Sequence, residues 1–141
     1  MNNAKKKAGS PEPVRQAQGK LRRRIMIADD DPGILDALTI MLEDGGYEVE
    51  TTTNGSTVQN MKEELPDLLL LDIWMSGWDG REACKYLKSQ ELTKHIPIIV
   101  VSANRDVEQI AREAGADDFL AKPFQMDDLL AIVAKYAHLT R

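Results

Sequence analysis

The sequence predicts an α/β protein in which one parallel β-sheet is covered by helices on both faces. Five short segments of strand length alternate with five segments whose apolar residues recur at helical spacing, which is typical of this class. Three of the strand-length segments are apolar throughout, as expected of strands buried on both faces: Ile25–Ala28, Leu68–Leu71 and Ile98–Val101. A length of 141 residues fits one domain that buries a core without disulfide bonds.

The five predicted strands differ in pattern according to their expected burial. They cover Ile25–Ala28, Tyr47–Thr52, Leu68–Leu71, Ile96–Val101 and Phe119–Ala121. The second strand alternates in hydrophobicity, which indicates that one of its faces is less buried. Pro97 stands near the start of the fourth strand, where its missing N–H donor is tolerated.

Each predicted helix carries one apolar stripe. The stripes are Ile34, Leu35, Leu38, Met41 and Leu42 in the first; Val58, Met61 and Leu65 in the second; Ala83, Cys84 and Leu87 in the third; Val107, Ile110, Ala111 and Ala114 in the fourth; and Leu129, Leu130, Ile132 and Val133 in the fifth. Glycine is common just after a helix, so Gly45 and Gly115 are expected to end the first and fourth helices. Pro66 is expected to end the second.

Charge divides the chain into two parts. Residues 1–24 hold eight basic side chains and one acidic one, whereas the remaining residues hold 10 basic and 22 acidic ones. The basic part has no hydrophobic period and is rich in small and polar residues, so it cannot offset the entropy lost on ordering. We therefore predict a disordered basic tail at residues 1–22 and a folded domain at residues 23–141.

Composition excludes several classes of protein and site. One cysteine rules out a disulfide framework and a cysteine-based zinc site. No apolar run approaches the ~18 residues that a membrane helix needs, and no secretory signal is present, so we expect a cytoplasmic protein. A basic tail can bind nucleic acid or an anionic membrane, but the acidic body favours neither partner.

Chemically capable side chains follow the predicted strands at the points where the strands end. Asp29-Asp30-Asp31 follows the first strand, Asp72 the third, Ser102 the fourth and Lys122-Pro123 the fifth. Ligands of such sheets bind beyond the carboxyl ends of the strands, so these groups are expected to meet at one edge. Converging carboxylates repel one another unless a cation relieves them, and oxygen ligands suit Mg²⁺ or Mn²⁺. With the lysine and the hydroxyl, this set fits a phosphoryl group that an aspartate can accept.

Five segments, in this order and spacing, resemble the receiver domain of two-component response regulators. They are Ile25-Met26-Ile27-Ala28-Asp29-Asp30-Asp31, Leu68-Leu69-Leu70-Leu71-Asp72, Asp79-Gly80, Val101-Ser102-Ala103 and Ala121-Lys122-Pro123-Phe124. The resemblance covers the chain from about Arg23 to Arg141. It implies a doubly wound sheet of five parallel strands in the flavodoxin-like order 2-1-3-4-5, with five helices.

The resemblance also implies a role for each residue at the edge of the sheet. Asp72 would be the phosphoacceptor, and Asp29 and Asp30 the acidic pair, with Asp30 a direct ligand of Mg²⁺ and Asp29 acting partly through water. Trp74 would offer the metal only its backbone carbonyl. Lys122 would pair with the phosphoryl oxygens.

Three further roles follow from the same resemblance. Ser102 would be the switch hydroxyl, and Phe119 would be the aromatic switch residue that turns inward as Ser102 shifts. The Lys122–Pro123 peptide bond would be cis. From its position in the sequence, Asp31 is expected to cap the following helix.

The implied function is a signalling switch that receives a phosphoryl group from a histidine kinase or a histidine phosphotransfer protein. Phosphorylation would shift the conformation of the face that binds a downstream partner, which is formed by the fourth helix, fifth strand and fifth helix. We expect no output domain within this chain, which would be either a stand-alone regulator or the excised domain of a longer protein. It would not be an enzyme beyond self-catalysed phosphoryl acceptance and slow autodephosphorylation.

Two alternatives remain open from the residues. A phosphorylation-independent adaptor with the same fold would be expected to lose some of the acidic, serine or lysine positions, and all are kept here. An aspartate-nucleophile phosphohydrolase of the haloacid dehalogenase type would need a second aspartate two residues after the first, where this sequence has Trp74.

Overall fold

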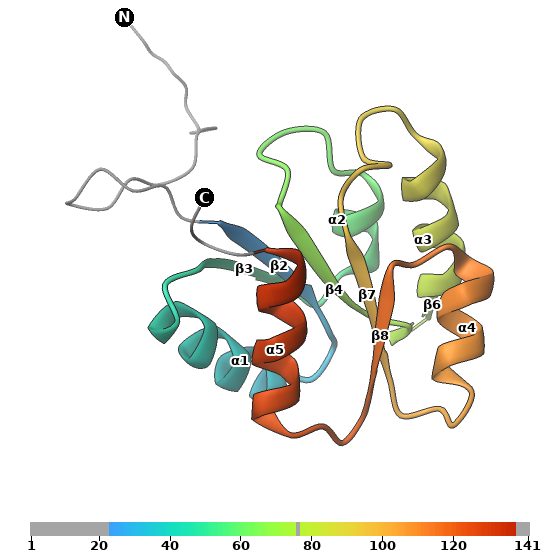
Figure 1. The fold of residues 1–141 in the computed structure, drawn as a ribbon. Helices are drawn as coiled ribbons and strands as arrows, with labels where there is room; N and C mark the ends of the chain where they lie inside the picture. Colours follow the sequence, from blue (N-terminus) through green and yellow to red (C-terminus); the bar gives the residue numbers. More distant parts are fainter. Residues whose placement is uncertain (1–22, 76, 138–141) are drawn as a thin grey trace, which may run out of the picture.

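The five-stranded parallel sheet has the predicted order in a computed structural model that describes residues 23–75 and 77–137. The strands are β2 (Arg24–Ala28), β3 (Glu48–Thr52), β4 (Leu68–Asp72), β7 (Ile98–Ser102) and β8 (Asp118–Ala121). They lie side by side as β3-β2-β4-β7-β8, and every pair is parallel (Figure 1). Counting these five strands along the chain gives 2-1-3-4-5, which confirms the prediction. The predicted tail at residues 1–22 lies outside the described residues.

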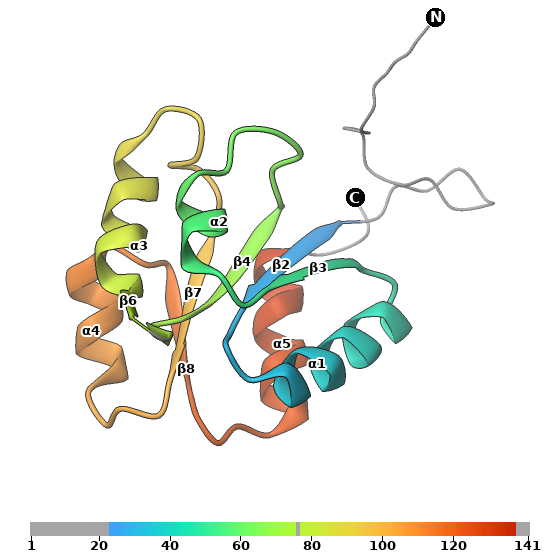
Figure 2. The ribbon, with the colours of Figure 1, turned by 180° about the vertical axis from the view of Figure 1, so that it is seen from behind.

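The described part of the chain contains five helices, arranged on both faces of the sheet. They are α1 (Pro32–Asp44), α2 (Gly55–Gln59), α3 (Gly80–Ser89), α4 (Val107–Ala114) and α5 (Met126–Tyr136). Helices α1 and α5 cover one face, and α2, α3 and α4 cover the other (Figures 1 and 2). Within the described residues, none of these helices has the length and apolar character needed to cross a membrane.

The core divides into two layers because successive residues of a strand point to opposite faces. In β2, Ile25 and Ile27 pack against residues of α1 and α5, whereas Met26 and Ala28 pack against residues of α2, α3 and α4. All residues of β4 and β7 are buried, as expected of central strands covered on both sides. The central strands therefore form a rigid support for the residues that follow them.

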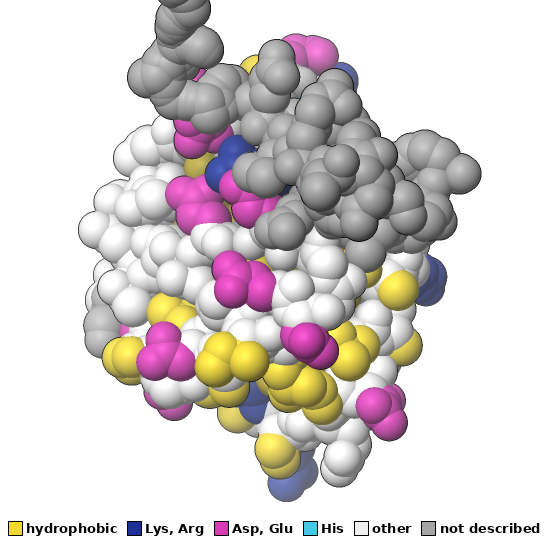
Figure 3. Space-filling view, turned by 90° about the vertical axis from the view of Figure 1, so that its left-hand side faces the viewer, with side chains coloured by type: hydrophobic (Ala, Val, Ile, Leu, Met, Phe, Trp, Pro, Cys, Tyr) yellow, Lys and Arg dark blue, Asp and Glu magenta, His cyan; other side chains and the backbone are white. Residues whose placement is uncertain are grey.

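Surface hydrophobic residues do not form one uninterrupted patch on the side of the molecule that carries α1. Figure 3 shows this side, where hydrophobic side chains gather in the lower half with acidic side chains between them. Ile40 of α1 is exposed to 68% and is the most exposed large hydrophobic side chain of the described residues.

The second helix is shorter than the spacing of its apolar residues predicts. Helix α2 ends at Gln59, and Asn60 follows it outside helical geometry. Met61 and Leu65 nevertheless pack, partly buried, against the same core layer as Val58. They come from an irregular segment in which Glu64 has a positive φ of 52°. The expectation that the helix continues to Leu65 is wrong, because a loop keeps these apolar contacts.

A two-stranded antiparallel hairpin follows β4 and was not predicted. It consists of β5 (Trp74–Met75) and β6 (Trp78–Asp79). The Trp78 indole packs directly onto Gly55, where an added Cβ would lie only 2.0 Å from the ring. Any side chain at position 55 would therefore displace Trp78, so Gly55 fixes the hairpin against the start of α2.

Candidate functional site

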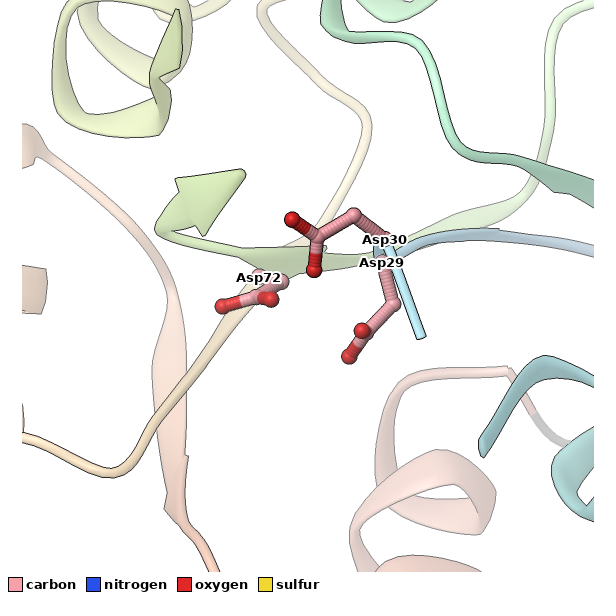
Figure 4. A group of neighbouring side chains, drawn as sticks. All are labelled: Asp29, Asp30 and Asp72. Atoms are coloured by element: carbon pink, nitrogen blue, oxygen red, sulfur yellow. The ribbon is translucent and has the colours of Figure 1, made fainter. Parts of the chain in front are cut away.

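Three carboxylates meet where β2 and β4 end. Asp29 and Asp30 directly follow β2, and Asp72 is the last residue of the neighbouring strand β4. One carboxylate oxygen from each residue lies within 4.8 Å of the others, and Figure 4 shows the three side chains gathered at this edge. The structure therefore brings together the acidic residues that the sequence placed at the carboxyl end of the sheet.

Two of these carboxylates are buried. Asp29 is exposed to 3% and Asp72 to 7%, whereas Asp30 is exposed to solvent. Burial raises the pKa of Asp72, the ammonium of Lys122 lowers it, and the neighbouring charge of Asp29 raises it again, so the net shift is upward. The ionised form of Asp72 is therefore less favourable in the folded protein than in water.

Lys122 supplies the cation at this site. Its Nζ lies 2.8 Å from Oδ2 of Asp29 and 3.5 Å from Oδ2 of Asp72. Burial alone would lower the pKa of Lys122, but the hydrogen bond to Asp29 and the charges of Asp72 and Asp29 outweigh it and raise the pKa. Lys122 follows β8, and its peptide bond to Pro123 is cis.

Ser102 lies at the end of β7, close to the same edge. Its side chain is almost fully buried, and its Oγ accepts a hydrogen bond of 3.0 Å from the backbone N–H of Asn104. The backbone carbonyl of Ser102 accepts from the N–H of Lys122 at 2.9 Å, which links the ends of β7 and β8. The hydroxyl is thus held on the strand next to the one that carries Asp72.

Backbone groups hold the acidic residues in place. The N–H of Trp74 donates to Oδ1 of Asp72 at 3.3 Å, and the N–H of Asp31 donates to Oδ1 of Asp29 at 2.9 Å. Asp31 caps α1, because its Oδ1 accepts from the N–H of Gly33 at 2.9 Å. This cap confirms the role predicted for Asp31.

Phe119 lies in β8, partly buried, and packs against the apolar cluster that joins β7 to α4. Ile73, Val107 and Ile110 belong to this cluster. Phe119 thus packs against a cluster that includes Ile73, the residue after Asp72. Its rotation with Ser102 remains a prediction.

The donor set fits a hard divalent cation. Three carboxylates and one ammonium leave a formal charge of −2 among Asp29, Asp30, Asp72 and Lys122. Mg²⁺ is bound in proteins by a small number of carboxylate oxygens, with the other positions left to water or phosphate oxygens. The ligand role expected of the Trp74 carbonyl remains a prediction.

Gly80 brings the start of α3 against the acceptor strand. Its N–H donates to the carbonyl of Ile73 at 2.8 Å, and an added Cβ would lie 3.0 Å from backbone atoms of Ile73. Asp79 caps α3 by accepting from the N–H of Arg81 at 2.9 Å. The Asp79-Gly80 pair, noted in the sequence, thus closes the hairpin after Asp72.

Arg81 is the residue near the site that sequence reasoning missed. Its guanidinium lies over the Trp74 ring, with Cζ 4.7 Å from the ring centroid, and is bound by the carboxylate of Asp79. The only signal in the sequence was its position directly after Asp79-Gly80. Pairing across the hairpin, which brings Trp74 opposite Asp79, could not be read from that position.

Comparison with known proteins agrees with the geometry. A family model for the response regulator receiver domain matches residues 25–134. The transcriptional regulator RpaA of Synechocystis, described as DNA-binding, is 38% identical over 113 residues, which are 78% of this chain and 47% of RpaA. The regulator PhoB of Escherichia coli is 35% identical over 79% of this chain and 50% of its own length. The chain thus spans about half the length of the curated relatives it matches.

Two solved structures share the fold over nearly their whole length. A response regulator structure from Chloroflexus aurantiacus has a TM-score of 0.72 and 32% identity, covering 82% of this chain and 97% of that one. The receiver domain of sensor histidine kinase PA1611 from Pseudomonas aeruginosa has a TM-score of 0.70 and 26% identity, with coverage of 82% and 97%. Its structure contains a magnesium ion in the active site cleft. Sequence, fold and site geometry together show that this chain belongs to the response regulator receiver domains of two-component systems.

Proposed function

We propose that this chain is a phosphorylation-controlled switch whose phosphoacceptor is Asp72. The observation that supports this most strongly is the convergence of three carboxylates within 4.8 Å, with the ammonium of Lys122 beside two of them. A structural ion pair needs one carboxylate for each cation. The excess of negative charge at a buried edge instead suits a site that binds a metal and a phosphoryl group.

The transfer needs little from the protein beyond position and charge. An oxygen of the ionised Asp72 carboxylate attacks phosphorus, and the bond between phosphorus and the donor breaks, with the bonding electrons leaving on the donor. Asp72 needs no general base because its carboxylate carries no proton to remove. Lys122, whose Nζ lies 3.5 Å from Asp72, would neutralise a phosphoryl oxygen, and the Ser102 hydroxyl would donate to another.

Asp29, Asp30 and Asp72 are the residues that would hold the divalent cation. When bound, Mg²⁺ would neutralise negative charge on the phosphoryl oxygens during transfer. Mn²⁺ has the same preference for oxygen ligands and would serve as well.

The donor would be a histidine kinase or a histidine phosphotransfer protein, as is general for receiver domains. The downstream partner would bind the face formed by α4, β8 and α5, after a shift that begins at Ser102 and Phe119. In energetic terms, phosphorylation would shift an existing equilibrium between two conformations. Catalysis would be limited to the chain's own phosphorylation and slow dephosphorylation. The protein would act in the cytoplasm.

Intact-mass measurement after incubation with acetyl phosphate and Mg²⁺ tests this proposal. The wild type is expected to gain one phosphoryl group, and the adduct should be absent without Mg²⁺ and in Asp72→Asn. Asp36→Asn is the matched control, because Asp36 is an exposed carboxylate of α1 that does not belong to the group of three. No adduct on the wild type at early times, or an equal adduct on Asp72→Asn, would contradict the proposal.

A further inference from the structure

Trp74 is a large aromatic residue that remains half exposed two residues after the proposed phosphoacceptor. Its residue exposure is 47%, although most large apolar side chains of the described residues are buried. Its backbone N–H nevertheless holds Oδ1 of Asp72 at 3.3 Å. Whatever fixes Trp74 therefore also fixes one of the groups that orient the acceptor carboxylate.

Three contacts link Trp74, Asp79 and Arg81 in a closed circuit. Trp74 pairs with Asp79 across the antiparallel hairpin. Asp79 binds the guanidinium of Arg81 through two nitrogens, with Nε 3.1 Å from Oδ1 and Nη2 2.9 Å from Oδ2. The same guanidinium lies 4.7 Å from the centroid of the Trp74 ring. Each residue of the circuit is thus held by the other two.

Rigid structure supports this circuit on both sides. Asp79 also caps α3, which anchors its carboxylate to a helix. Trp78, the neighbour of Asp79 in β6, is packed against Gly55 at the start of α2. The Trp74 ring itself is half exposed, and the Arg81 guanidinium lies over it.

We propose that Arg81 is a positioning residue for the chemistry at Asp72, acting by holding Trp74 through this circuit. The inference rests on the proposed function of Asp72, and Arg81 would affect the rate at which Asp72 is phosphorylated. Because the stack restrains Trp74, it also restrains the N–H that binds Asp72 and the carbonyl expected to face the metal. Loss of the stack would leave the carboxylates in place and loosen the segment that orients them.

The expected effect is modest because the stack is partly exposed. A cation–π contact at an exposed site corresponds to about a two- to fivefold change in an equilibrium or rate constant. We therefore expect Arg81→Ala to slow phosphorylation by acetyl phosphate about two- to fivefold and to weaken the apparent affinity for Mg²⁺ by a similar factor. Arg81→Lys keeps a cation near the ring and should recover part of both losses.

A matched control separates this effect from the loss of any surface ion pair. Lys94 forms an exposed pair with Glu91 at 2.9 Å in the loop between α3 and β7, and among the described residues it has no aromatic ring contact of the kind found at Arg81. Lys94→Ala should leave phosphorylation and the affinity for Mg²⁺ unchanged. In a Trp74→Leu background, Arg81→Ala should have no further effect, because the ring through which it acts is gone.

¹⁹F NMR of protein labelled with 5-fluorotryptophan gives a readout that does not depend on phosphorylation. The chain has two tryptophans, so two resonances are expected, and Trp74→Leu assigns them. The Trp74 resonance should shift on addition of Mg²⁺, and Arg81→Ala should move this titration to higher Mg²⁺ concentration. Thermal unfolding of each variant, followed by circular dichroism, checks that the fold is intact.

The outcomes distinguish this inference from the proposed function. If the wild type is phosphorylated but Arg81→Ala matches it in rate and in the Mg²⁺ titration, the positioning role is wrong and the proposed function stands. An equal effect of Arg81→Ala with and without Trp74 also overturns the role. If the wild type takes no phosphoryl group, the proposed function fails, and the Mg²⁺ titration of the Trp74 resonance still decides whether Arg81 positions this segment.

Discussion

Both ends of the sheet carry clusters of acidic and basic side chains, but the carboxylates of the two clusters differ in burial. At the amino end, Arg24 lies 3.7 Å from Glu48 and 3.1 Å from Glu50, and Arg23 lies 3.7 Å from Asp67. The side chains of these acids are 30–49% exposed, although that of Arg24 is exposed to only 14%. At the carboxyl end, Asp29 and Asp72 are almost fully buried, with Lys122 as their shared cation.

This difference predicts that the cluster at the amino end stabilises the fold, whereas the cluster at the carboxyl end costs stability. Ion pairs whose carboxylates remain partly exposed stabilise a protein modestly and need no ligand. Buried carboxylates in excess over their cation cost stability, and proteins keep such arrangements where they bind or react. Mutations at the carboxyl end should therefore depend on Mg²⁺, whereas mutations at the amino end should not.

Lys122→Met should have the largest effect. Loss of the ammonium leaves Asp29 and Asp72 buried without their cation, so in metal-free buffer the free energy of unfolding should fall by about 3 kcal/mol. Phosphorylation by acetyl phosphate should slow about 100-fold, as expected when a charged donor to the transition state is removed. Chemical denaturation and intact-mass time courses measure the two effects. A rate within threefold of wild type would contradict this role for Lys122.

Asp30→Asn should stabilise the metal-free protein, because it removes one of three neighbouring negative charges. We expect the free energy of unfolding to rise by about 1 kcal/mol in the presence of EDTA. The stabilisation that Mg²⁺ gives to the wild type should be lost in the variant. Asp36→Asn again serves as the control, and a variant still stabilised by Mg²⁺ would show that Asp30 is not a ligand.

Arg24→Ala tests the amino end. Its guanidinium binds Glu50 and the carbonyl of Glu64, and its loss should lower the free energy of unfolding by about 1 kcal/mol. The same loss is expected with and without Mg²⁺, and high salt should reduce it. A Mg²⁺-dependent loss, measured by denaturation in both buffers, would mean that the two ends are coupled.

The pH dependence of Asp72 should give the smallest effect. Its pKa in the folded protein is raised above the ordinary 3.8, so above that raised pKa the ionised carboxylate destabilises the metal-free fold. Asp72→Asn should therefore be more stable than the wild type at neutral pH. As the pH falls through the raised pKa, Asp72 takes up a proton and the difference should close. Denaturation of both proteins from pH 7 to pH 4 checks this sign; a difference that widens on acidification would refute it.

The sequence predicted the sheet and the acidic group of the site, but not the length of α2 or the contact of Arg81 with Trp74. Continuous apolar strands and helical stripes were enough for the parallel sheet, and the residues after each strand were enough to place Asp72 with Asp29 and Asp30. The length of α2 was not predictable, because Met61 and Leu65 keep the spacing of a helix while they pack from a loop. The stack of Arg81 on Trp74 depends on hairpin pairing, which no local pattern in this segment indicates.

Chemical trapping of the phosphorylated residue tests the central claim most directly. Borohydride reduces an aspartyl phosphate to homoserine, so protein treated with acetyl phosphate and Mg²⁺ can be reduced, digested and analysed by mass spectrometry. Homoserine is expected at residue 72 and nowhere else, and the signal should require Mg²⁺. Homoserine at another aspartate, or none on protein that has gained a phosphoryl group, would show that Asp72 is not the acceptor.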